Sequence, residues 1–104
     1  MNLLLLFGFG NSKVKEALQH DAVIIDVRTA YEFDQGKVPN SINIPVDRIA
    51  VNAERIKQMK KPVVFYCSSG MRSATATRIM KEKGLKDVYN GGSWARVLKI
   101  INKL

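Results

Sequence analysis

The chain has 104 residues, of which 46% are hydrophobic, which is enough to build one domain around a single core. It contains one cysteine and one histidine, which excludes an internal disulfide and a Cys-x-x-Cys pair and argues against a closed zinc site. The net charge of +8 is spread over scattered lysines without interleaved aromatic residues, which favours attraction of small anions over specific binding of nucleic acid.

Residues 1–10 are apolar and differ in composition from the rest of the chain. They are far too short to span a bilayer, and they lack the basic start and the Ala-x-Ala site of a secretory signal. We interpret them as an N-terminal segment that docks on the domain or contacts a membrane surface or a partner, with export as a weaker alternative. Residues 11–104 are predicted to form the folded domain.

The next two predicted elements are a short helix and a central strand. Asn11 or Ser12 can cap the helix, which ends near His20 at the surface, where a solvated role is expected for this histidine. Residues 23–27 form a nearly continuous apolar run, which is typical of a strand in a parallel sheet that is covered on both faces.

Three charged residues, Asp26, Arg28 and Glu32, lie at or just beyond the C-terminal end of that strand. In open α/β sheets, ligands bind at this edge. Thr29 and Glu32 have the spacing of a capping box that opens a short helix, and Glu32 could also pair with Arg28. We interpret the three charged residues as a polar clamp that supports the strand–helix corner, rather than as groups that take part in chemistry.

The middle of the chain alternates turns with short elements. A turn over residues 36–40 contains Asn40, which tolerates a left-handed backbone, and residues 41–45 form a short strand closed by a proline. Residues 46–59 have the apolar spacing of one or two short helices, which lead to a strong strand at 63–66.

The C-terminal part is predicted to contain a helix at 74–81 that ends at Gly84, a strand at 87–89 and a last helix. Residues 90–93 are rich in glycine and predict a flexible turn at the same sheet edge as the end of the preceding strand. The last helix has an apolar side that places Trp94 in the core and is formed by Trp94, Val97, Leu98 and Ile101. This alternation of strands and helices predicts one α/β domain.

The clearest chemical signal is Cys67, which ends the strand at 63–66. A small turn at 68–70 follows, and Arg72 and Ser73 lead into the next helix. The N–H groups of the turn, the helix N-terminus and the arginine all favour the charged form of the thiol, so a reactive thiolate is expected. A lone cysteine is usually a small apolar core residue, but this combination favours a functional one. A free reactive thiol suits a reducing compartment, which predicts a cytoplasmic protein.

Several motifs in this order make the chain resemble a single-domain rhodanese-like sulfurtransferase. They are Val-Ile-Ile-Asp-Val-Arg at 23–28, Glu-Phe at 32–33, residues 36–45, Cys-Ser-Ser-Gly-Met-Arg-Ser at 67–73 and Tyr-Asn-Gly-Gly at 89–92. The resemblance covers nearly the whole chain from about Lys13. It implies an α/β fold with a mostly parallel five-stranded sheet and helices on both faces.

The resemblance also implies a role for each residue of the loop. Cys67 would be the nucleophile that takes up a sulfane sulfur and becomes a persulfide. Arg72 would orient an oxyanion donor such as thiosulfate or brace the loop. The residues expected to bind the substrate are Ser68, Ser69, Gly70, Met71, Arg72 and Ser73. No metal or organic cofactor is required, and the partners would be a small anionic sulfur donor and a thiol or protein acceptor. Lys37 stands where the family commonly has a histidine, so no role is assigned there.

Other functions stay open at this point. A non-catalytic persulfide carrier or a docking module would keep the same loop. A phosphatase or arsenate reductase is less well matched, because four residues separate Cys67 from Arg72 and those enzymes typically have five. Nucleic-acid binding driven by the charge of +8 would predict retention on polyanions that depends strongly on salt.

Overall fold

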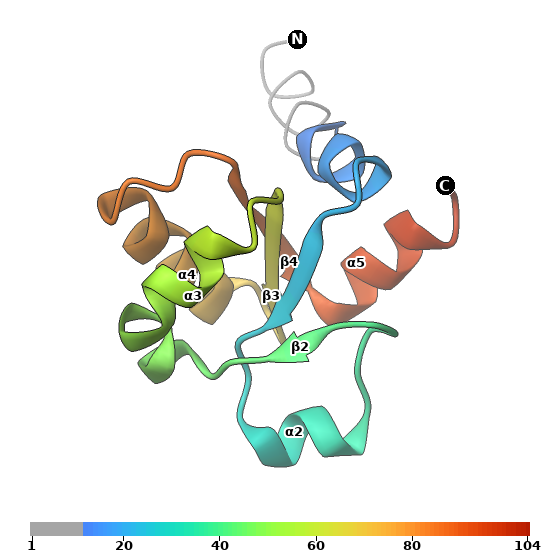
Figure 1. Ribbon diagram of the computed structural model, residues 1–104. Helices are drawn as coiled ribbons and strands as arrows, with labels where there is room; N and C mark the ends of the chain where they lie inside the picture. The colour runs from blue at the N-terminus through green and yellow to red at the C-terminus, as the bar shows by residue number, and fades with distance from the viewer. Residues whose placement is uncertain (1–11) are drawn as a thin grey trace, which may run out of the picture.

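The computed structural model describes residues 12–104, whose four strands form one parallel sheet (Figure 1). The strands are β1 (Val23–Asp26), β2 (Ile42–Asn43), β3 (Val63–Cys67) and β4 (Val88–Ser93). They lie in the order β2-β1-β3-β4, so β1 and β3 are central. The expected count of five strands is wrong for the described residues, where four strands are found. The sequence pattern itself offers four strand-like runs, and the fifth strand rested on the family resemblance alone.

Helices cover both faces of this sheet (Figure 1). The α-helices are α2 (Ala30–Gln35), α3 (Ala53–Gln58), α4 (Met71–Glu82) and α5 (Trp94–Ile101), and residues 12–19 are also helical. The stretch from 46 to 59 contains two 3-10 turns, η1 (Val46–Arg48) and η2 (Ala50–Asn52), and then α3. The predicted first helix is confirmed, but Ser12 is already helical and Asn11 lies outside the described residues, as do residues 1–10.

β3 is the centre of the core because both of its faces are covered. Val63, Phe65 and Cys67 pack into the cluster that includes residues of α3 and α4. Val64 and Tyr66 point to the opposite face, where α5 and the helix over 12–19 pack. Side chains alternate between the two faces of a strand, so all five residues are fully buried.

Two parts of the C-terminal region differ from the prediction. Residues 90–93 are not a flexible turn but the second half of β4, which continues to Ser93 opposite Cys67. A bulge at this point skips Gly91, and a Cβ at Gly91 would lie 2.8 Å from side-chain atoms of Val64 and Val97. The absence of a side chain therefore lets β4 approach its neighbours closely, and the expected shared edge is confirmed.

Several local predictions are confirmed. Thr29 and Glu32 form a complete capping box, Asn40 has a φ of 68°, and Gly84 follows the end of α4 with a φ of 96°. The four apolar residues on one side of α5 all pack against the same core cluster, and His20 is exposed at the end of its helix. In the described part of the chain, no helix has the length and apolar character needed to cross a membrane.

Candidate functional site

The candidate site is built around Cys67, the last residue of β3, whose side chain is fully buried. The chain turns sharply after it, and Gly70, with a φ of 101°, becomes the N-cap of α4. α4 therefore begins three residues earlier than the predicted start at residue 74. This early start places Arg72 and Ser73 in the first helical turn, so that the N-terminus of a twelve-residue helix faces the sulfur.

The sulfur receives hydrogen bonds from the loop that surrounds it. The N–H of Gly70 donates to Sγ of Cys67 at 3.0 Å, and Oγ of Ser73 lies 3.5 Å from the same atom. Burial of the thiol raises its pKa, but the hydrogen bonds of Ser73, Gly70 and Ser69 outweigh burial, and the net effect lowers the pKa of Cys67. The expected stabilisation of the thiolate thus has an identified source in the loop.

Ser73 is held in place by Asn90, a residue of β4 that sequence reasoning did not single out. Oγ of Ser73 donates to Oδ1 of Asn90 at 2.6 Å, and Nδ2 of Asn90 donates to the carbonyl of Gly70 at 3.2 Å. The N–H of Gly92 fixes the same Oδ1 at 2.9 Å. The only signal in the sequence was that residues 90–93 lie at the same sheet edge, because the glycines there predicted a turn and not a strand that presents Asn90 to the loop.

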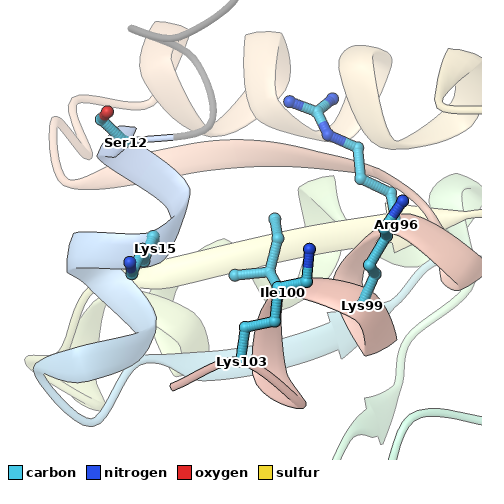
Figure 2. Close-up of a pocket in the computed structure, with 6 residues that line it drawn as sticks. All are labelled: Ser12, Lys15, Arg96, Lys99, Ile100 and Lys103. Atoms are coloured by element: carbon cyan, nitrogen blue, oxygen red, sulfur yellow. The ribbon is translucent and has the colours of Figure 1, made fainter.

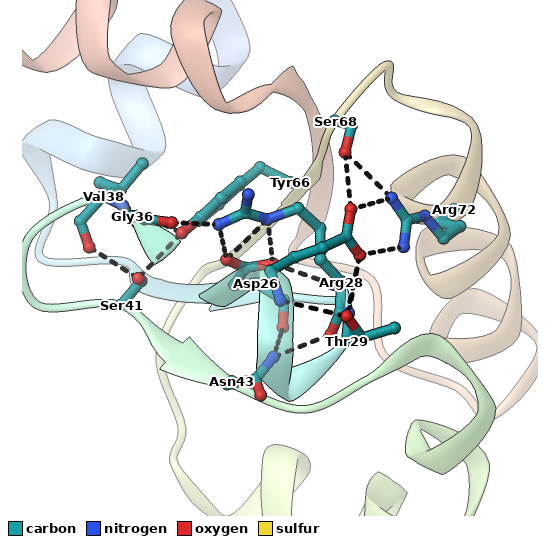
Figure 3. Close-up of polar contacts among 11 residues, drawn as sticks. Asp26, Arg28, Thr29, Gly36, Val38, Ser41, Asn43, Tyr66, Ser68 and Arg72 are labelled. Atoms are coloured by element: carbon teal, nitrogen blue, oxygen red, sulfur yellow. Dashed lines mark hydrogen bonds and ion pairs between the residues drawn. The ribbon is translucent and has the colours of Figure 1, made fainter. Parts of the chain in front are cut away.

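Arg72 is paired with Glu32, and Figure 3 shows its guanidinium beside Ser68. Its Nη1 and Nη2 donate to the two carboxylate oxygens of Glu32 at 2.7 and 3.1 Å, and Nη2 also donates to Oγ of Ser68 at 3.0 Å. These hydrogen bonds raise the pKa of Arg72 and hold the pKa of Glu32 well below its usual range. The suggested pairing of Glu32 with Arg28 is therefore wrong, because Glu32 ties α2 to the loop.

Arg28 is instead paired with Asp26 in a buried clamp (Figure 3). Nε and Nη2 of Arg28 donate to the carboxylate of Asp26 at 2.7 to 3.0 Å, and Nη2 donates to the carbonyl of Gly36 at 2.6 Å. The guanidinium also lies 4.8 Å from the centre of the Trp94 ring. The hydrogen bond and the charge of Asp26 raise the pKa of Arg28 against the effect of burial. This pair joins the end of β1 to the residue after α2, and Glu32, which was expected in the same clamp, is paired elsewhere.

Tyr66 extends this clamp toward the turn before β2. The N–H of Val38 donates to the Tyr66 hydroxyl at 3.0 Å, and Oγ of Ser41 lies at the same distance from it. The Ser41 hydroxyl also lies 2.6 Å from the carbonyl of Val38, which accepts from it, and either hydroxyl can donate in the contact between Ser41 and Tyr66. Burial raises the pKa of Tyr66, against the smaller lowering effect of the hydrogen bonds from Ser41 and Val38.

The predicted site residues thus fall into three groups. Cys67, Gly70 and Ser73 meet at the sulfur, and the amide of Ser69 contributes there. Ser68 and Arg72 meet at Glu32, whereas Asp26 and Arg28 form a separate pair. The side chain of Met71 is exposed. Within residues 12–104, no three His, Cys, Asp or Glu side chains are grouped to hold a metal ion.

Known proteins with similar sequences include proteins named as sulfurtransferases. The family model of the rhodanese-like domain matches residues 11–95. A sulfurtransferase from Allochromatium vinosum is 35% identical over 80 residues, which are 73% of this chain and 74% of that protein. A putative mitochondrial thiosulfate sulfurtransferase from Schizosaccharomyces pombe is 40% identical over 85 residues, with 69% of this chain and 60% of that protein covered.

A solved structure shows the same fold. A rhodanese with anions from E. coli has a TM-score of 0.66 and 30% identity, and the match covers 72% of this chain and 89% of that one. Other curated relatives are much longer, and the chain spans only 15% and 23% of the length of two of them.

Proposed function

The chain belongs to the rhodanese-like domain family, and we propose that it transfers a sulfane sulfur from thiosulfate or a similar anionic donor to a thiophilic acceptor through a persulfide on Cys67. The observation that carries this proposal is the surroundings of the sulfur. Sγ of Cys67 accepts a hydrogen bond from the Gly70 N–H at the start of α4, with the Ser73 hydroxyl beside it. These donors favour a thiolate, which is the nucleophilic form of cysteine.

In the first half-reaction, the Cys67 thiolate attacks the outer sulfur of thiosulfate. A new S–S bond forms to Cys67, the S–S bond within thiosulfate breaks, and its electron pair leaves with sulfite. The persulfide that results carries the negative charge on its outer sulfur. The loop N–H groups that hold Sγ are positioned to stabilise this charge, which is the general way in which fixed donors favour such a step.

Ser73 and Asn90 control the hydrogen bonding of the sulfur. The Ser73 hydroxyl has three acceptors within reach, which are Oδ1 of Asn90 at 2.6 Å, the carbonyl of Gly70 at 3.1 Å and Sγ of Cys67 at 3.5 Å. A protonated Cys67 can donate to Oγ of Ser73 while Ser73 donates to Asn90. When the thiol loses its proton, rotation of the hydroxyl turns this hydrogen toward the sulfur. The pair thus serves both protonation states without movement of the backbone.

Arg72 acts as a brace of the loop. Its Nη1 and Nη2 donate to Glu32 and Ser68, so the bound donor competes with an existing bidentate ion pair for these atoms. The contacts therefore support bracing over direct orientation of the oxyanion, the other role that the sequence left open. The charge of Arg72 still contributes to the positive potential around the site.

In the second half-reaction, an acceptor thiolate or cyanide attacks the outer sulfur of the persulfide. The bond between Cys67 and that sulfur breaks, and its electron pair returns to Cys67 as the thiolate. The chain has a single cysteine, so the persulfide cannot be resolved by a disulfide within the chain. Sulfur must pass to another molecule, and a reducing compartment such as the cytoplasm would keep Cys67 available between turnovers.

Intact mass spectrometry tests this proposal directly. The protein and Cys67→Ser are incubated with thiosulfate, desalted, weighed and then treated with cyanide or a thiol. We expect the parent protein to gain one sulfur atom and to lose it on treatment, whereas the variant gains nothing while its circular dichroism is unchanged. Sulfur uptake by the variant, or no uptake by a folded parent protein with Cys67 free, would overturn the mechanism.

One observation favours the alternative of a persulfide carrier. The Cys67 side chain is fully buried, and a partner that opens the loop would be needed if free donors did not reach it. Steady-state kinetics separates the two functions. Sustained turnover with thiosulfate and cyanide supports the enzyme, whereas a single loading that only a partner protein discharges supports the carrier.

A further inference from the structure

A basic groove lies between the helix over residues 12–19 and α5 (Figure 2). Its volume is about 530 Å³, and the described residues that line it are Ser12, Lys15, Arg96, Lys99, Ile100 and Lys103. Four of these six side chains are cations and none is acidic. Such a volume is typical of sites for small molecules of cofactor size.

The cations of the groove are arranged in a row. Arg96 and Lys99 are three residues apart and lie on one face of α5, Lys103 follows in the turn after that helix, and Lys15 lies on the other helix (Figure 2). In the described part of the chain, Lys15, Lys99 and Lys103 take part in no ion pair. Ile100 anchors α5 against the cluster that contains Val14 of the facing helix. The helix α5 is therefore packed on the core, while the charged ends of these side chains are exposed to solvent.

Arg96 connects this groove to the candidate site. A Cβ at Gly92 would lie 3.0 Å from Nη1 of Arg96, so the arginine packs directly over this residue of β4. Gly92 in turn touches the loop, because a Cβ at Gly70 would lie 3.3 Å from the Cα of Gly92. Gly70 is the residue whose N–H donates to Sγ of Cys67. Three successive contacts thus lead from the end of the groove to the sulfur.

The distance between the groove and Cys67 sets the length of a molecule that could reach both. Ser93 is paired with Cys67, and α5 starts at the next residue. With a rise of 1.5 Å per residue, the row of cations from Arg96 to Lys103 extends about 4 to 15 Å from that pairing. A molecule with its anionic groups among the lysines needs an arm of about 10 to 15 Å to bring a sulfur atom to the loop.

We propose that this groove binds the anionic head group of the sulfur acceptor, a low-molecular-weight thiol that carries two or more phosphate or carboxylate groups at a distance from its sulfur. The proposal rests on the proposed function, because it names the second substrate of the Cys67 persulfide. The bound thiolate attacks the outer sulfur of the persulfide, the new persulfide leaves with the acceptor, and Cys67 returns as the thiolate. RNA is less well matched, since the described lining has no aromatic side chain on which a base could stack.

The test compares two thiols that share one reactive arm. Coenzyme A carries three phosphate groups at the far end of its pantetheine arm, whereas pantetheine has the same thiol and no phosphate. The Cys67 persulfide is loaded first, with thiosulfate or with inorganic polysulfide, and freed of donor. Its discharge is then followed by intact mass in a single turnover at several concentrations of each thiol. We expect half-saturation with coenzyme A at a concentration at least about tenfold lower than with pantetheine at low salt.

Charge-reversal variants test whether the groove causes the preference for coenzyme A. Lys99→Glu with Lys103→Glu should remove the advantage of coenzyme A and leave discharge by pantetheine unchanged. The matched control is Lys81→Glu with Lys86→Glu, which changes the net charge by the same amount. Its two exposed lysines lie at the end of α4 and before β4, at the sheet edge away from Cys67. The control should keep the preference for coenzyme A.

Binding is also measured without chemistry, by calorimetric titration of coenzyme A into Cys67→Ser. Saturable binding that is lost in the Lys99→Glu, Lys103→Glu background supports the proposal. Equal discharge by the two thiols, or no binding to Cys67→Ser, overturns it even when Cys67 loads normally. If the two lysines govern retention of transfer RNA and not binding of coenzyme A, the groove belongs to RNA instead. A failure of Cys67 to load from either donor counts against the proposed function. The calorimetric result still tests whether the groove binds coenzyme A.

Discussion

Two arginine–carboxylate pairs at the carboxyl edge of the sheet have the same length but different surroundings. Arg28 and Asp26 lie 2.7 Å apart, and their side chains are 5% and 0% exposed. Arg72 and Glu32 also lie 2.7 Å apart, but their side chains are 36% and 32% exposed. Water screens the second pair and not the first. A distance alone therefore says little about an ion pair, and burial separates the pair that supports the fold from the pair that shapes the loop.

The largest effect is expected from Asp26→Ala. The substitution leaves the Arg28 guanidinium buried without its counter-charge, which typically costs about 3 to 5 kcal/mol of folding free energy. Urea unfolding followed by circular dichroism measures this cost. Glu32→Gln is the matched change in the other pair and should cost about 1 kcal/mol or less, because that pair is largely solvated. Equal losses in the two variants would show that burial does not distinguish the pairs.

A second, kinetic effect is expected at the exposed pair. If Arg72 braces the loop through Glu32, Arg72→Ala and Glu32→Gln should each lower kcat/KM for thiosulfate by about 10- to 100-fold, since small displacements of a site cost rates of this order. The double variant should then be no worse than Arg72→Ala alone, because both changes remove the same interaction.

A different outcome would assign Arg72 to the substrate. Direct binding of the donor predicts that Glu32→Gln frees the guanidinium and leaves kcat/KM unchanged or raised, while Arg72→Ala raises KM. Chemical unfolding of each variant is the control, because a brace of the loop should change stability much less than rate. The same measurements on Asp26→Asn extend the comparison to the buried pair. This variant should lower stability with little change in KM.

The two pairs also show what the sequence could reveal. The apolar runs at 23–27 and 63–66 are long enough to predict central strands, and the spacing of Thr29 and Glu32 predicts the helix that follows β1. The loop around Cys67 is contiguous, so its residues were identified together. These features depend on neighbours along the chain, which is why local patterns contain them.

The partners across the fold were not predictable in the same way. Glu32 lies forty residues before Arg72, and the sequence suggested only the nearby Arg28 as its partner. Asn90 faces Ser73 because β4 continues beyond Tyr89 and its side chains alternate between the two faces, whereas the glycines there suggested a turn. Pairings of this kind depend on register and packing, which a periodic pattern does not specify.

The smallest expected effect concerns the titration of Cys67. Ser73→Ala removes the side-chain hydrogen bond that lowers the pKa of Cys67, while burial of the thiol continues to raise it. The pKa should therefore rise, and less thiolate should be present at any given pH near neutrality. The pH dependence of alkylation by iodoacetamide measures this change, and its midpoint should move to higher pH. Asn90→Ala should shift the midpoint in the opposite direction, because the Ser73 hydroxyl then loses the acceptor that competes with the sulfur for its hydrogen.

Thr75→Ala is the matched control for this shift. It removes a hydroxyl from the same end of α4, where Thr75 donates to the carbonyl of Met71 and makes no contact with the sulfur. Glu32 will not obscure the result, because its pKa lies well below its usual range and the contribution of its ion pair is lost only as the pH falls through that lowered value. The acid limb of the alkylation curve therefore reports Cys67. An unchanged midpoint in Ser73→Ala would mean that the backbone N–H groups alone stabilise the thiolate, and that Asn90 holds the loop without acting on the sulfur.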